Sequence, residues 1–90
     1  MNELLGRIET MLADPVGDRS QVERTLTDGY AHALALEAEG RRLQAQLAIL
    51  AHDAESHSHE LSVIAHRLDG TTAELERLRA VLVRLKQRLG

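Results

Sequence analysis

Leucine and other apolar residues recur along most of this chain at alternating steps of three and four residues. From Val22, at heptad position d, and Leu26, at position a, they keep one register through to Leu89. A seven-residue repeat places these positions on one stripe of a helix, so the pattern predicts long helices that pack along that stripe. The predicted helix–helix seam comprises Val22, Leu26, Leu36, Leu43, Leu47, Leu50, Leu61, Ile64, Leu68, Leu75, Leu78, Leu82, Leu85 and Leu89.

Breaks in this pattern divide the chain, which we expect to form a single helical domain over residues 1–90. Pro15 and Gly17 interrupt the first apolar segment and mark a linker. Ser20 and Glu23 fit a capping box at the start of the next helix. The expected order is a helix over about 2–13, a linker over 14–20, a helix over about 21–53, a polar tip over about 53–59 and a helix over about 60–89.

The continuous register is compatible with two architectures. In the first, the chain folds back between Glu55 and Ser56, and small residues meet large ones, as at Gly29 opposite Leu82. In the second, residues 21–89 form one straight helix of about 100 Å that pairs with a second chain. The absence of Gly and Pro from the turn favours the straight helix. Because the centre of the register falls inside the polar stretch, we predict an all-α fold with a short N-terminal helix followed by a long antiparallel coiled-coil helical hairpin.

Five apolar residues fall off the predicted seam. They are Leu34, Ile49, Val63, Val81 and Val83. Isolated exposed apolar residues are common, but five on a two-helix hairpin indicate that a further surface is covered. The first helix can cover part of it near Val22 and Leu89, and self-association into a helical bundle can cover the rest. We therefore expect a homo-oligomer, with a dimer favoured, and a different protein partner stays open.

Charge and composition narrow the classes of function. The 90 residues carry a formal net charge of −3, and only the carboxyl end is basic, so no nucleic-acid partner is expected. No apolar run approaches the roughly 20 residues of a membrane span, so no membrane partner is expected. The opening MNELLGRIET has neither the basic region nor the long apolar region of a signal peptide, which predicts a cytoplasmic location.

The stretch HDAESHSHE, residues 52–60, concentrates the candidate chemistry. Asp53 and His57 are four residues apart, as are Glu55 and His59, and either pair could supply two zinc ligands from one helix. A structural zinc site takes four ligands and a catalytic site three, and neither cysteine nor an HExxH motif provides the others. A zinc site shared between two chains stays open, but we expect no metal, no cofactor and no catalytic residue. The candidate tip contacts are Asp53, Glu55, His57, His59 and Glu60.

The sequence thus predicts a non-enzymatic coiled-coil interaction or scaffold module that acts through helix–helix contacts. One alternative is a regulatory effector of a larger complex that acts through the tip. In that respect the chain resembles the coiled-coil fingers with acidic tips of RNA polymerase secondary-channel regulators, although the further globular domain of those proteins is not predicted here. The other alternative is a straight, parallel coiled-coil dimer that spaces its partners.

Overall fold

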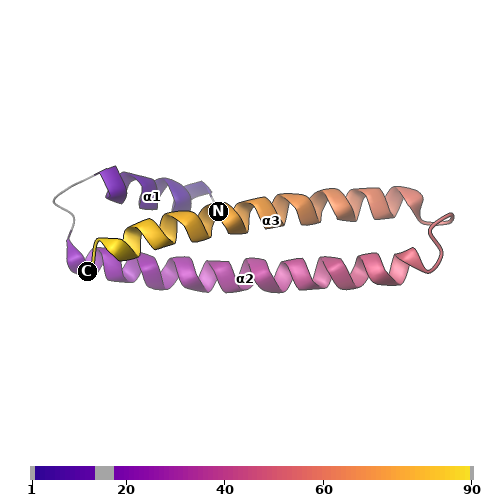
Figure 1. Ribbon diagram of the computed structural model, residues 1–90, viewed down its shortest axis with the longest axis horizontal. Helices are drawn as coiled ribbons and strands as arrows, with labels where there is room; N and C mark the ends of the chain where they lie inside the picture. The colour runs from indigo at the N-terminus through magenta and orange to yellow at the C-terminus, as the bar shows by residue number, and fades with distance from the viewer. Residues whose placement is uncertain (1, 14–17, 90) are drawn as a thin grey trace.

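Three helices make up the protein over the residues described by its computed structural model, 2–13 and 18–89. They are α1 (Asn2–Ala13), α2 (Arg19–Ala51) and α3 (Ser58–Gln87). The long helices α2 and α3 lie side by side and antiparallel, and α1 lies against the end that holds the carboxyl terminus (Figure 1). The molecule measures 56 × 17 × 16 Å between its Cα atoms. The predicted all-α fold with a short first helix and a long helical hairpin is confirmed, and the straight-helix alternative is wrong because the chain reverses at residues 52–57.

Close packing between the two long helices occurs where the register predicted a small residue opposite a large one. A Cβ placed on Gly29 would collide with the Cδ2 atom of Leu82, so α3 lies directly against the α2 backbone at this point. A Cβ on Gly40 would lie 3.9 Å from Cδ1 of Leu68, which is an ordinary contact. The seam is therefore tightest near the carboxyl terminus and looser towards the tip.

Seam residues are most buried at the end of the hairpin where α1 packs. The seam residues that are fully buried are Val22, Leu26, Leu43, Leu78, Leu82 and Leu85. Those that are only partly buried are Leu36, Leu47, Leu50, Leu61, Ile64, Leu68, Leu75 and Leu89. Two helices in contact cover each other along one stripe only, and a third helix is needed to enclose that stripe. Most of the fully buried residues accordingly lie at the end where α1 packs.

The short helix α1 adds its apolar face to this core. Leu5, Ile8 and Met11 are buried in one cluster with Val81 and Leu85 of α3. Val81 is one of the five off-seam apolar residues, and its exposed fraction is only 7%. The prediction that the first helix covers part of the off-seam surface is therefore correct for Val81.

Ion pairs flank this apolar contact between α1 and the hairpin. Arg7 lies 3.2 Å from the carboxylate of Asp28 in α2, and Arg77 of α3 lies 2.9 Å from the carboxylate of Glu9. All four side chains are about half exposed, so each pair contributes well under about 1 kcal/mol to stability. The pairs orient α1, whereas the buried side chains hold it.

The start of α2 differs from the predicted capping box. Asp18 is the N-cap, and its carboxylate accepts a hydrogen bond from the backbone N–H of Ser20 at 3.1 Å. Ser20 already lies inside the helix, and Glu23 accepts instead from the Arg19 side chain at 3.2 Å. Residues 14–17 of the predicted linker lie outside the described residues. An N-cap side chain accepts hydrogen bonds from the backbone N–H groups of the next two or three residues. Asp18, which directly precedes the helix, can do so, whereas Ser20 lies within the first turn.

The turn at the tip is also displaced from its predicted place. Helix α2 ends at Ala51, residues 52–57 form the turn, and α3 begins at Ser58. Backbone hydrogen bonds from Asp53 to Leu50, at 3.2 Å, and from His57 to Ala54, at 3.3 Å, tighten the turn without any glycine. Both helix ends therefore lie about two residues earlier than the polar pattern suggested.

Candidate functional site

The tip carries exposed side chains that do not converge on a common point. Asp53, Glu55, His59 and Glu60 are exposed, and the His57 side chain is 37% exposed. The nearest approach is 3.5 Å, between Nδ1 of His57 and a carboxylate oxygen of Glu60. Among the described residues, no group of three or more His, Asp or Glu side chains could hold a metal ion. The tip is thus a surface of separate polar groups.

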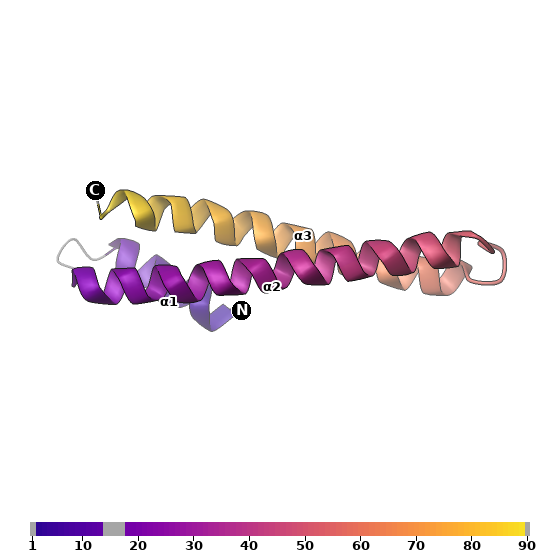
Figure 2. The ribbon, with the colours of Figure 1, turned by 90° about the horizontal axis from the view of Figure 1, so that it is seen from below.

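A different surface gathers apolar side chains, and we call it the open face. It is the side of the α2–α3 pair formed by heptad positions e and b of both helices. Helix α1 contacts the opposite side, at position c, through Asp28 and Arg77. Figure 2 shows α1 behind α2, over the first half of that helix only. Among the described helices, none lies against the e and b positions.

Three large apolar side chains are exposed on the open face. Tyr30 is 45% exposed and Leu34 is 64% exposed, both on α2, and Val83 on α3 is 56% exposed. Together with the buried residues Ala33 and Leu82 they line a shallow apolar hollow. Apolar side chains around one hollow form a continuous patch, which marks interaction surfaces far more often than scattered residues do.

A second hollow lies further along the face towards the tip. An ion pair between Arg79 of α3 and Glu37 of α2 closes the edge of the first hollow, and the same two residues border the second hollow. Gly40 and Thr71 also line this second hollow, and both are small residues at seam positions. Small side chains at the seam lower the surface between the two helices, so two neighbouring hollows lie along the open face, separated by the Glu37–Arg79 pair.

Two other exposed apolar residues lie apart from these hollows. Ile49 is 70% exposed and Val63 is 45% exposed. Both occupy position c, on the side where α1 packs, but they lie near the tip, beyond α1. Neither lines any of the hollows described for the open face.

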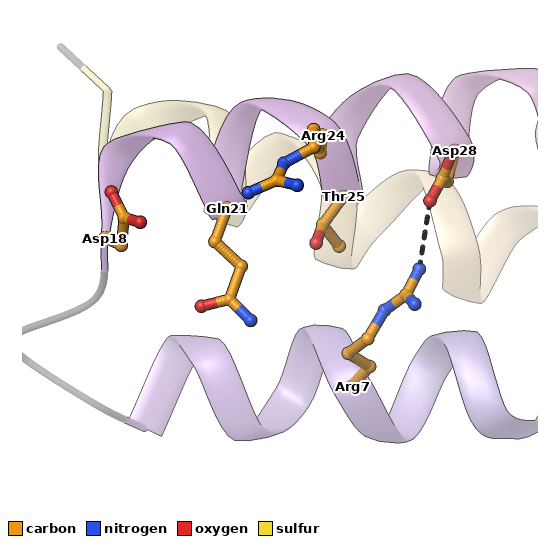
Figure 3. Close-up of a pocket in the computed structure, with 6 residues that line it drawn as sticks. All are labelled: Arg7, Asp18, Gln21, Arg24, Thr25 and Asp28. Atoms are coloured by element: carbon orange, nitrogen blue, oxygen red, sulfur yellow. Dashed lines mark hydrogen bonds and ion pairs between the residues drawn. The ribbon is translucent and has the colours of Figure 1, made fainter.

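A polar hollow lies where α1 meets the start of α2 (Figure 3). Its lining residues are Arg7, Asp18, Gln21, Arg24, Thr25 and Asp28. Two arginines face two aspartates, and Arg7 is already paired with Asp28 at 3.2 Å. This balance of charge selects neither an anion nor a cation, so the hollow is best understood as the polar joint between α1 and α2.

The sequence identified only part of the open face. Leu34 and Val83 were singled out as off-seam apolar residues, but they were grouped with Ile49, Val63 and Val81. The heptad position is the signal that would have separated them. Tyr30 on α2 and Arg79 on α3 both occupy position e, and Leu34 on α2 and Val83 on α3 both occupy position b. Equivalent positions on two antiparallel helices lie on the same side of the pair.

Comparisons with known proteins add no relative. The chain matches no family model, no curated protein and no solved structure. Among the described residues, no helix is long and apolar enough to cross a membrane. Function must therefore be argued from the surface of the hairpin itself.

Proposed function

We propose that this chain is a non-enzymatic helix–helix interaction module that self-associates through its open face. The observation that supports the proposal is the exposed patch of Tyr30, Leu34 and Val83 around an apolar hollow. The hairpin is a long, narrow body, and α1 contacts it at position c on the opposite side, so a second hairpin can approach this face without meeting α1. Two hairpins joined in this way would form a four-helix bundle.

The energy of the patch is of the right order for association. Full burial of a large apolar side chain contributes about 1.5–3 kcal/mol, so covering three half-exposed side chains on each of two copies contributes on the order of 6 kcal/mol. Association costs roughly 4–15 kcal/mol in lost freedom of motion. The patch therefore offsets only the lower part of this range, and a stable dimer needs contacts along more of the face.

The proposal is tested by placing charges on the open face. Sedimentation equilibrium at micromolar concentration should give a dimer mass for the unchanged chain and a monomer mass for Leu34→Lys with Val83→Lys. The matched control is Ile49→Lys with Val63→Lys, which adds the same charge at equally exposed apolar residues off the open face and should leave the dimer intact. Circular dichroism checks that all variants stay helical.

Two results would contradict self-association through this face. The first is a helical monomer for the unchanged chain throughout the micromolar range. The second is an equal loss of dimer in both pairs of variants, because added charge alone would then explain the effect.

Docking through the tip is the second candidate, and the exposure of Asp53, Glu55 and Glu60 at the end far from α1 favours it. A photo-crosslinking side chain at Glu55 should then yield a product with another protein. The same group at Leu34 should yield only a product between two copies. A tip that forms no product with another protein in cells would remove this candidate.

A further inference from the structure

We infer that two copies join along the full length of their open faces with both tips at the same end. This arrangement rests on the proposed self-association and adds its geometry. Helix α2 of one copy then lies antiparallel along α3 of the second copy, and the two-fold axis runs parallel to the long axis of the hairpins.

Helical spacing supports contact along the whole face. Positions e and b are separated by alternating steps of three and four residues, as positions a and d are, so they form a second stripe along each helix. The first stripe faces the other helix of the same hairpin. The second points about a quarter turn away, which is where a neighbouring helix lies in a four-helix bundle.

Apolar side chains meet one another in this arrangement. At the level of the exposed patch, Tyr30 of α2 lies opposite Val83 of the second copy, and the two-fold axis repeats this contact. Leu34 joins them from the next turn, so the patches of both copies form one cluster. Nearer the tip the facing residues are small: Ala48 on α2 is exposed and Ala65 on α3 is partly exposed. Small residues let helices approach closely, so contact can continue there without large side chains.

Two pairs of charges on the open face are complementary in the same arrangement, whereas Glu37, which is paired with Arg79 of its own hairpin, would lie opposite Glu76. Glu23 of α2 lies at the level of Lys86 of α3, and Arg41 lies at the level of Asp69. When α2 faces α3 of the second copy, each of these charges meets its opposite across the interface. Exposed pairs add little affinity, but they select one orientation over others.

Reversing one hairpin end to end matches these surfaces less well. With full overlap, α2 would face α2, and Tyr30 and Leu34 would lie opposite Gln44 and Arg41 of the second copy. The exposed patch would then be covered by polar side chains, which loses the main apolar contribution.

A staggered, reversed pair could still join the two patches, but with too little contact. The face is about as long as the 56 Å molecule, and two adjoining helices make it nearly 20 Å wide, which gives roughly 1,100 Å². Each partner of a standard stable interface buries about 800 Å², a value that full overlap reaches. Overlap of the carboxyl-terminal halves alone would cover roughly 550 Å², which is below that value. The area therefore favours full overlap, and with it tips at the same end.

Paired tips are the structural consequence of this dimer. Asp53, Glu55 and Glu60 of both copies would lie at one end of the bundle, and the two copies of α1 would lie on its outer sides at the other end. Any partner that contacts the tip would meet two equivalent acidic turns related by the two-fold axis.

Disulfide cross-linking tests the arrangement directly, since the chain contains no cysteine. One preparation carries Ala48→Cys and the other Ala65→Cys, with a size tag on one chain to distinguish the products. The two preparations are mixed, left to exchange subunits and mildly oxidised. The disulfide-linked dimer of the two different chains should then form in severalfold larger amount than either dimer of identical chains. The control pair is Ala45→Cys with Ala73→Cys, at outward positions f of the same helices, and it should give little product.

The outcomes separate this inference from the proposed function. The staggered pair would give a dimer mass and no disulfide between Ala48→Cys and Ala65→Cys. In that pair, two copies of Leu34→Cys would readily form a disulfide with each other. That result would overturn the same-end arrangement and leave self-association standing. A monomer mass with no cross-link in any pair would overturn both.

Discussion

Replacing Gly29 with alanine should destabilise the hairpin, although alanine is the better helix former. A Cβ at this position would overlap Cδ2 of Leu82, and Leu82 is only 2% exposed. Overpacking a well-filled core costs about 1–3 kcal/mol. Alanine favours a helix over glycine by about 1 kcal/mol, which offsets part of this cost. We therefore expect a net loss of about 1 kcal/mol in the free energy of unfolding.

Gly70 supplies the matched control for this substitution. It lies inside α3, it is exposed, and nothing lies within 4 Å of a Cβ built on it. Gly70→Ala should therefore gain the full helix preference of about 1 kcal/mol. The two variants make the same chemical change and should differ by about 2 kcal/mol, or roughly 10 °C in Tm for a domain of this size.

Thermal unfolding followed by circular dichroism measures this difference. All samples need the same protein concentration, because association makes Tm depend on concentration. If Gly29→Ala proved as stable as Gly70→Ala, the Leu82 side chain would have moved aside at little cost, and the tight packing inferred at Gly29 would be wrong.

Three further results are expected from other parts of the molecule. The double variant Leu50→Cys, Leu61→Cys should oxidise within one chain and run as a cross-linked monomer on denaturing gels. The heptad register places these two residues opposite each other beside the turn, and a disulfide needs Cα atoms within about 7 Å. Dominant links between chains would contradict the hairpin. Asp18→Ala should lower the free energy of unfolding by about 1 kcal/mol, measured by urea denaturation, because it removes the side-chain cap of α2. Ser20→Ala should have a smaller effect, and the reverse order would restore the capping box predicted from the sequence. Zinc should change neither the Tm nor the sedimentation mass, whereas saturable binding that raises the Tm would show that the tip holds metal.

The sequence alone was sufficient to predict the order of the helices and the reversal of the chain. A heptad register reports which side of a helix is buried, and the polar stretch around Glu55 identified where that register folds back on itself. Gly29 opposite Leu82 followed from the same count. These features depend on local periodicity, which is written directly in the order of residues.

Helix ends were predicted less well because they depend on individual hydrogen bonds. Asp18, rather than Ser20, caps α2, since the carboxylate reaches the N–H of Ser20 at 3.1 Å. Backbone hydrogen bonds close the turn without the glycine or proline that usually marks one.

Only the tertiary structure decided which apolar surface stays open. Val81 and Val83 are two residues apart on one helix, yet α1 covers the first and leaves the second 56% exposed. Periodicity places both off the seam, but it carries no information about the side on which α1 docks. That choice depends on contacts between distant residues, such as Arg77 with Glu9 and Val81 with the buried face of α1, and these exist only once the hairpin has formed.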